Sequence, residues 1–281
     1  MKTISVETIY EAVKQTCGKI AVIYPKDILE SLKANREKEN GSSRDAMDML
    51  IENAVIAEKE NIPICQDTGM AVVYLSIGQD VHLTGGSLEE AVQRGVRDGY
   101  TNNYLRASVV DDPVFERTNT KDNTPAILYT SIVDGEEVVI EVMAKGFGSE
   151  NMSAIKMLKP AEGVEGIRQF VLDTIRNAGP NACPPMIVGV GIGGTFDYCA
   201  YLSKRALFHA LDERNSDPRY AELEEELIEE ANTLRIGPMG LHGKTTVLNV
   251  AIETCPTHIA GMPCAVNICC HACRHERVVI K

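Results

Sequence analysis

The stretch that most constrains this chain is residues 61–69 (NIPICQDTG), where a thiol, an amide and a carboxylate follow one another as Cys65, Gln66 and Asp67. A helical pattern precedes the stretch and a strand pattern follows it. Pro63 disfavours helical backbone at the residue before it, and Gly69 permits a turn that few other residues tolerate. Three polar side chains at such a turn cannot all enter a core, so we expect them to bind a ligand.

Composition limits the class of protein. The 281 residues are 44% hydrophobic and 24% charged, which is ordinary for a soluble enzyme. No apolar run approaches the roughly 20 residues of a membrane helix, and no signal region follows the N-terminus, so we expect a cytoplasmic protein without a membrane partner. The net charge of −12 argues against a nucleic-acid partner.

The apolar periodicity predicts alternating helices and strands. Helices are expected at residues 5–16, after Pro25, after the Ser42 capping pattern, from Ser87 to about 99, and at 166–177, 206–211 and 217–235. Strands are expected at 71–77, 126–132, 138–143, 186–190 and 245–252, with Asp134-Gly135 joining two of them in a hairpin. We therefore predict an α/β (α+β) fold, a single domain over residues 1–281 with mixed β-sheets packed by helices.

Residues 101–125 form a long polar segment without a helical or strand pattern, and the segment contains Arg106. Loops of this length inside a compact domain are uncommon and are often functional. We expect this segment to contribute to a binding site.

A glycine motif at residues 189–194 (GVGIGG) fits the G-x-G-x-x-G fingerprint of dinucleotide-binding proteins. The acidic residues about 20 positions later follow a helical pattern, whereas that fold requires a second strand there. We expect close backbone packing or contact with an oxyanion at these glycines, with nucleotide binding as the alternative.

Nine cysteines in a cytoplasmic chain should remain reduced. In the cysteine-rich tail, residues 264–275, Cys270 and Cys273 match half of a zinc site or a redox dithiol. A zinc-stabilised binding module and an electron carrier, with Cys269 or Cys273 as a fourth ligand, are therefore alternatives to an enzyme.

Three cysteines, Cys65, Cys183 and Cys270, share a turn-like polar setting at the end of an apolar segment. Three thiolates from distant positions suit an iron–sulfur cluster in which one iron has no protein ligand. An iron with an open coordination position acts as a Lewis acid.

Four motifs together resemble the α subunits of two-subunit class I fumarases and of L(+)-tartrate dehydratases: PICQDTG at 63–69, KGFGSEN at 145–151, CPP at 183–185 with the glycine run, and Thr257-His258 with NICCH at 267–271. The resemblance covers essentially the whole chain. The cysteine-rich tail departs from the usual pattern of the family, and the choice of Cys270 over Cys269 depends on the histidine that follows.

The resemblance implies an oxygen-sensitive [4Fe-4S] cluster held by Cys65, Cys183 and Cys270. It implies that Gln66, Asp67, Arg106 and His258 contact a small dicarboxylate, with Asp67 and His258 as catalytic candidates. Gly148 would offer a backbone N–H to the substrate.

The expected function is the reversible hydration of fumarate to (S)-malate, a hydro-lyase step of the tricarboxylic acid cycle. The alternative is L(+)-tartrate dehydratase. Further catalytic residues of this family lie in a separate β subunit, so we expect an α2β2-type oligomer and little activity from this chain alone.

Overall fold

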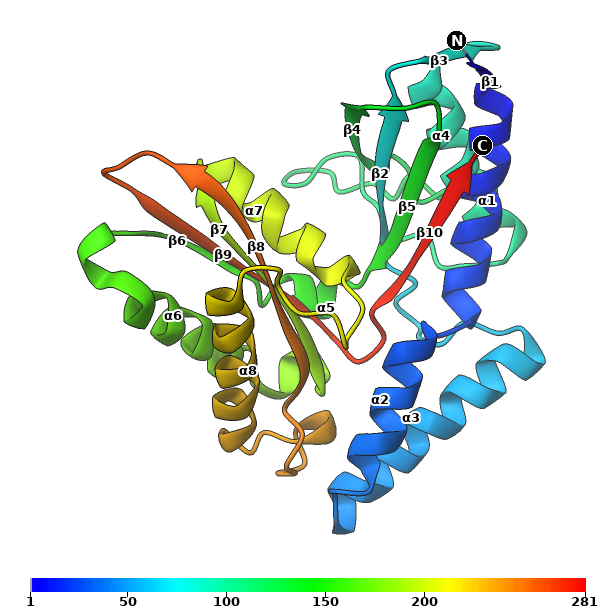
Figure 1. The fold of residues 1–281 in the computed structure, drawn as a ribbon. Coiled ribbons are helices and arrows are strands. Elements are labelled where there is room, and N and C mark those ends of the chain that lie inside the picture. The colour runs from blue at the N-terminus through cyan, green and yellow to red at the C-terminus, as the bar shows by residue number, and fades with distance from the viewer. Residues whose placement is uncertain (1) are drawn as a thin grey trace. The chain divides into compact units, whose positions relative to one another are not determined.

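A computed structural model describes residues 2–281 (Figure 1). The chain forms two compact units, and each unit is built from separated segments. The first unit contains residues 2–25, Ala54–Phe147 and Arg274–Lys281, and the second contains Lys26–Asn53 and Gly148–Cys273. Because the segments alternate along the chain, no single sequence boundary separates the two cores.

The first unit combines helices with two sheets. Its elements are β1 (Lys2–Ser5), α1 (Val6–Val22), the end of α3 (Gly41–Glu60), β2 (Met70–Gly78), β3 (Val81–Thr84), α4 (Leu88–Asn102), β4 (Ile127–Val133), β5 (Val138–Lys145) and β10 (Arg274–Ile280). Strands β1 and β3 pair in parallel, and the larger sheet has the order β10-β5-β2-β4. Helices α1 and α4 supply one side of a core whose other side is this sheet (Figure 1).

Sequence signals explain several of these elements. The Ser87 hydroxyl caps α4 by accepting the N–H of Glu90, as the capping pattern predicts. Strand β2 carries the predicted buried run, with Val73 and Leu75 in the core under the helices. The segment between α4 and β4 contains no helix or strand, which confirms the predicted long loop.

The predicted hairpin at Asp134-Gly135 is wrong. Strand β2 lies between β4 and β5, pairing in parallel with β4 and antiparallel with β5. The loop after β4 crosses the end of β2, where the N–H of Gly78 donates to the carbonyl of Glu137 at 2.8 Å. A side chain at Gly78 would place its Cβ 2.3 Å from the carbonyl oxygen of Gly135, so glycine at this position permits the crossing.

The second unit surrounds the sheet β6-β9-β7-β8. Its elements are α2 (Lys26–Arg36), the start of α3, α5 (Phe147–Glu150), β6 (Ala154–Leu158), η1 (Pro160–Glu162), α6 (Gly163–Ala178), η2 (Gly179–Ala182), β7 (Met186–Gly194), α7 (Phe196–Arg205), η3 (Ala206–Phe208), α8 (Pro218–Thr233), η4 (Pro238–Gly240), β8 (Val247–Thr257) and β9 (Met262–Cys269). Strand β7 pairs in parallel with β8 and antiparallel with β9. Both larger sheets are therefore mixed, which confirms the predicted α/β class.

The helix predicted at residues 206–211 is wrong over most of its length. Helix α7 ends at Arg205, one 3-10 turn follows over Ala206–Phe208, and His209 has extended backbone. The side chain of His209 instead lies 2.7 Å from a carboxylate oxygen of Glu253 on β8.

The glycine motif packs a helix onto a strand. Residues 189–192 lie inside β7, and a Cβ at Gly189 or Gly191 would lie 2.0 or 2.1 Å from a main-chain oxygen of α7. This confirms the expectation of close backbone packing. Since these glycines are within a paired strand, residues 189–192 form no phosphate-binding loop.

Candidate functional site

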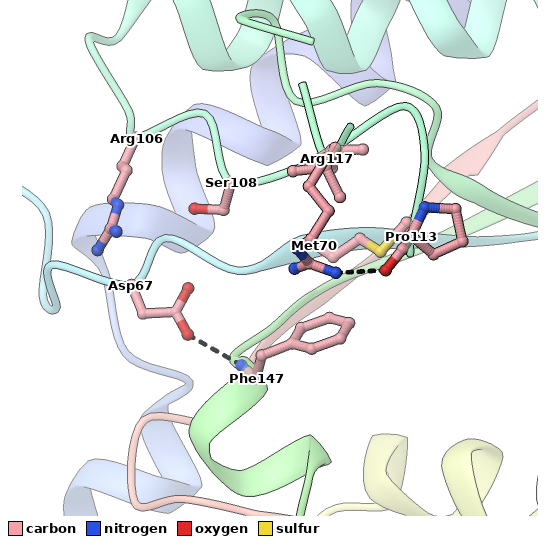
Figure 2. A pocket seen from close by; sticks show the side chains of 9 residues that line it. Asp67, Met70, Arg106, Ser108, Pro113, Arg117 and Phe147 are labelled. Atoms are coloured by element: carbon pink, nitrogen blue, oxygen red, sulfur yellow. Dashed lines mark hydrogen bonds between the residues drawn. The ribbon is translucent and has the colours of Figure 1, made fainter. Parts of the chain in front are cut away.

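A cavity of about 540 Å³ in the first unit brings two predicted site residues together. Asp67 and Arg106 line it, although they are far apart in the chain (Figure 2). Its other lining residues are Met70, Ser108, Val109, Val110, Pro113, Arg117 and Phe147. The cavity is therefore the candidate binding site of the first unit.

The Asp67 turn, residues 65–69, is fixed by the carboxylate of Asp67 itself. One carboxylate oxygen accepts the N–H of Gly69 at 2.9 Å, and the other accepts the N–H of Phe147 at 2.9 Å (Figure 2). The carboxylate thus joins the turn to Phe147, which belongs to the same unit. Because a carboxylate has about four acceptor positions, Asp67 retains lone pairs for a ligand in the cavity.

Buried side chains hold the main chain of the turn from outside. The hydroxyl of Tyr100 donates to the carbonyls of Thr68 and Gly69 at 2.9 and 3.1 Å. The amide of Asn123 donates to the carbonyl of Gly69 at 3.0 Å, and its oxygen accepts the N–H of Ser108 at 2.8 Å. Asn123 therefore links the Asp67 turn to the loop that carries Arg106.

A second link connects the same two segments. The hydroxyl of Thr68 donates to the carbonyl of Arg106 at 2.9 Å. Thr68 and Asn123 are both buried, so water competes poorly for these hydrogen bonds. The relative position of Asp67 and Arg106 is consequently set by two buried links, one through Thr68 and one through Asn123.

The net charge of the cavity lining is positive, whereas the net charge of the chain is negative. Two guanidinium groups, Arg106 and Arg117, and one carboxylate, Asp67, are the ionisable groups of its lining, which leaves one excess positive charge (2 − 1). Met70 and Phe147 add apolar surface. This combination suits a small anion, because arginine binds carboxylates with two parallel hydrogen bonds.

Arg117 and Ser108 were not among the predicted site residues. Arg117 has a positive φ of 48°, and its guanidinium donates to the carbonyl of Pro113 in the same loop (Figure 2). The isolated bridge between Val110 and Asn119 closes this loop. The long polar segment 101–125 was the only sequence signal for these residues, and it did not distinguish them from their neighbours.

The other predicted residues of the Asp67 turn have different exposures. Cys65 is half-buried and Gln66 is exposed, so both side chains are accessible from outside the core. Neither is part of the cavity lining.

In the second unit, the segments of Cys183 and Cys270 lie together. The N–H of His271, the residue after Cys270, donates to the carbonyl of Cys183 at 3.3 Å. Cys183 ends the 3-10 turn η2 with left-handed backbone at φ 50°, a conformation that few residues other than glycine adopt. Both thiols are half-buried, whereas Cys269 and Cys273 are buried, which supports the choice of Cys270 within the tail.

Gly148 and His258 also belong to the second unit. Gly148 lies in the four-residue helix α5 and is exposed. His258 lies in an exposed turn after β8, where its Nδ1 accepts the N–H of Ala260 at 3.2 Å. In the neutral ring this bond places the proton on Nε2, so that Nε2–H is available as a donor. These two residues remain predictions as site residues.

The remaining cysteines differ from the three predicted ligands in exposure. Only Cys255 shares their half-buried state, and Cys17, Cys199, Cys264, Cys269 and Cys273 are buried. Burial raises the pKa of Cys17 and Cys264 to about 12 and also raises that of Cys199, which keeps these groups as thiols at neutral pH. Since thiolates are the metal ligands, the buried cysteines are poor candidates and the predicted three fit the donor set of a cluster.

The predicted ligand set draws on both units, with Cys65 in the first and Cys183 and Cys270 in the second. Among residues 2–281, no three histidine, cysteine, aspartate or glutamate side chains are grouped as a metal site. The cluster therefore stays a prediction that the chemistry of the cysteines supports.

Comparison with known proteins assigns the family. The family model described as "Fumarate hydratase (Fumerase)" matches residues 10–279. A protein of Methanocaldococcus jannaschii, provisionally named L(+)-tartrate dehydratase subunit alpha, is 41% identical over 279 residues, which are 97% of this chain and 98% of the relative. The L(+)-tartrate dehydratase subunit alpha of an Escherichia coli strain is 33% identical, covering 99% of this chain and 91% of the relative. That of Shigella sonnei is 32% identical, covering 98% and 92%.

Two further findings concern the class of protein. In the part of the chain that the structure describes, no helix has the length and apolarity needed to cross a membrane. The family match extends over nearly the whole chain, and the cavity that holds Asp67 and Arg106 lies within the matched residues. The chain belongs to the fumarate hydratase (Fumerase) family and is a hydro-lyase.

Proposed function

We propose that this chain is the α subunit of a [4Fe-4S]-dependent hydro-lyase that converts fumarate reversibly to (S)-malate in the cytoplasm together with a separate β subunit. The observation that carries the proposal is the cavity in which buried hydrogen bonds hold Asp67 and Arg106 side by side. A family match over residues 10–279 supports the reaction type.

Arg106 binds one carboxylate of the substrate in this proposal. A dicarboxylate is repelled by a chain with a net charge of −12, and the excess positive charge of the cavity reverses that repulsion locally. A guanidinium group also stabilises the negative charge that develops on the carboxylate when a proton leaves the neighbouring carbon. Gln66, Gly148 and His258 are the further proposed substrate contacts.

Asp67 moves the proton. Its carboxylate is held by the N–H groups of Gly69 and Phe147, which orients its free lone pairs without occupying them. A group that transfers a proton must be held within hydrogen-bond reach of the reacting atom, and these two hydrogen bonds fix the carboxylate in the cavity that would hold the substrate. Hydration adds the proton to one alkene carbon and the hydroxyl to the other, so water is the only co-substrate.

Cys65, Cys183 and Cys270 would hold the cluster. When bound, an iron–sulfur cluster with one iron free of protein ligands supplies a Lewis acid to the site. The half-buried state of these three cysteines supports the assignment, because ligands must reach the cofactor while the protein shields it.

L(+)-tartrate is the second candidate substrate, and the printed names of the relatives from M. jannaschii, E. coli and S. sonnei favour it. Tartrate differs from malate by one hydroxyl group. The hydroxyl of Ser108 in the cavity lining is a group of this chain that could pair with it.

The same names, each ending in "subunit alpha", support a partner subunit. We propose an α2β2-type assembly in which the β subunit completes the site. The chain alone should then bind the cluster and have little activity.

The test is anaerobic reconstitution of this chain with iron and sulfide, alone and mixed with its β subunit, followed by assays with fumarate, (S)-malate and L(+)-tartrate. We expect turnover only in the mixture. Arg106→Gln should lower kcat/KM by about 100-fold or more, and Arg97→Gln on α4, which lies outside the cavity, should not. Equal turnover by the isolated chain would refute the need for a partner, and preference for tartrate over fumarate would replace the proposed substrate with the second candidate.

A further inference from the structure

Arg274, the first residue of β10, is buried with two of its donors unused. Its side chain is 1% exposed. Nη2 donates to the main-chain carbonyl of Asp67 at 2.8 Å, but Nε and Nη1 have no hydrogen-bond partner among the described residues. A buried charge whose hydrogen bonds are incomplete costs several kcal/mol in general, so such a group calls for an explanation.

The main chain at Gly146 runs beside Arg274 and Asp67. A Cβ at Gly146 would lie 3.8 Å from Nη2 of Arg274 and 3.3 Å from a carboxylate oxygen of Asp67, so the main chain passes close to both groups. The carboxylate of Asp67 already accepts the N–H groups of Gly69 and Phe147. Nε and Nη1 of Arg274 are therefore donors that remain available to a bound group.

The position of Arg274 in the chain indicates what that group is. Arg274 is four residues after Cys270, and its hydrogen bond ends on Asp67, two residues after Cys65. It is thus tied to two of the three proposed ligand segments. Three thiolates carry more negative charge than an oxidised [4Fe-4S] core carries positive charge, so the bound cluster is an anion.

We propose that the Nε–H and Nη1–H groups of Arg274 donate to sulfur of this cluster, and that Arg274 is its buried counter-charge. The inference rests on the proposed function, since it needs the cluster. Hydrogen bonds to sulfur and nearby charge are established determinants of cluster potentials. Arg274 then stabilises the cluster and makes its reduction more favourable.

If Arg274 has this role, its substitution should affect the stability of the protein differently with and without the bound cluster. Without the cluster, Nε and Nη1 of Arg274 are buried donors without an acceptor among the described residues, so a neutral side chain there should cost the empty protein little more than the hydrogen bond to the Asp67 carbonyl. With the cluster, the same substitution removes two hydrogen bonds and a positive charge. A purely structural arginine would stabilise both forms equally.

The experiment compares wild-type protein with Arg274→Gln, Arg274→Lys and Arg277→Gln. Arg277 lies on the same strand but is exposed, so its variant is the matched control. Each protein is purified without cluster, reconstituted anaerobically, and measured for thermal unfolding in both forms, for iron release to a chelator, and for the reduction potential of the cluster.

For Arg274→Gln we expect a smaller drop in unfolding temperature for the empty form than for the loaded form, iron release faster by about tenfold or more, and a more negative potential. Arg274→Lys keeps the charge, so its potential should lie closer to wild type, and Arg277→Gln should match wild type.

Two results would overturn the inference alone: an Arg274→Gln cluster with wild-type potential and iron release, or an equal loss of stability in the empty and loaded forms. An Arg274→Gln chain that does not fold at all counts as the second of these results. Wild-type protein that takes up no iron and sulfide would overturn the proposed function and this inference together.

Discussion

The segment of Cys65 in the first unit and the segment of Cys183 in the second are held by different means. In the first unit, side chains of Tyr100, Asn123 and Arg274 reach the main chain of the Asp67 turn from distant positions. In the second unit, the segment of Cys183 is held by main-chain hydrogen bonds, including those from Met239 to Pro184 and from His271 to Cys183.

The close packing around these segments differs in the same way. A Cβ at Gly240 would lie 2.6 Å from Pro180 in the turn before Cys183, and glycines in β7 allow contact with α7. The Asp67 turn therefore depends on hydrogen bonds from distant side chains as well as on the close contact at Gly69, whereas the turn before Cys183 and strand β7 depend on close contacts at glycines. Removing a hydrogen-bonding side chain should damage the Asp67 turn most, and adding a Cβ should damage the packing of α7 on β7.

The largest effect is expected for Gly191→Ala in the second unit. The added Cβ would lie 2.1 Å from the carbonyl oxygen of Cys199 and 2.5 Å from the nitrogen of Ser203, so α7 has to move away from β7. We expect a loss of about 3 kcal/mol or more in the free energy of unfolding, measured in urea. Gly261→Ala is the control, because the nearest atom to its Cβ lies at 3.9 Å. Equal stability of the two variants would show that the second unit does not depend on close packing at glycine.

The second-largest effect is expected when the buried side-chain amide of Asn123 is removed from the first unit. Asn123→Ala leaves the carbonyl of Gly69 and the N–H of Ser108 without their buried partner. We expect a loss of roughly 2–3 kcal/mol in unfolding free energy, since each unsatisfied buried group costs about 1–3 kcal/mol. The exposed Asn119, changed to Ala, should cost far less. A small effect of Asn123→Ala would mean that Thr68 alone holds the two segments together.

The smallest effect concerns Glu39, a buried carboxylate that holds main chain of the second unit. Its carboxylate accepts the N–H groups of Lys244 and Thr245 and the hydroxyl of Ser43. Burial alone would raise the pKa of Glu39, but these hydrogen bonds lower it overall below its ordinary value of 4.5. Glu39 thus stabilises the fold above about pH 4.5, and this contribution is lost as the pH falls through the lowered pKa.

Glu39→Gln should therefore reduce the free energy of unfolding by about 1–2 kcal/mol at neutral pH. The difference from wild type should shrink below about pH 4.5. Urea unfolding of both proteins at several pH values measures this difference in the free energy of unfolding. A difference that stays constant down to acid pH would exclude the ionised carboxylate as the source.

Local signals in the sequence predicted the parts of the fold that depend on local contacts. The strand that became β2 and the cap at Ser87 follow from neighbouring residues. The hairpin at Asp134-Gly135 failed because turn propensity does not show that another strand lies between the two arms.

The candidate site divides in the same way. Asp67 and Arg106 were predicted, and the cavity brings them together. The residues that hold the turn, Tyr100, Asn123 and Arg274, are 31 to 207 positions from the turn residues that they contact. Each is an ordinary core or loop residue until the fold places it, so no local pattern could identify it.

The most direct test of the whole account is the iron and acid-labile sulfide content of anaerobically reconstituted cysteine variants. Cys65→Ser, Cys183→Ser and Cys270→Ser should each lose the cluster, whereas Cys255→Ser, the other half-buried cysteine, should keep about four irons and four sulfides per chain as in wild type. A full cluster in any of the first three variants, or its loss in Cys255→Ser, would contradict the account.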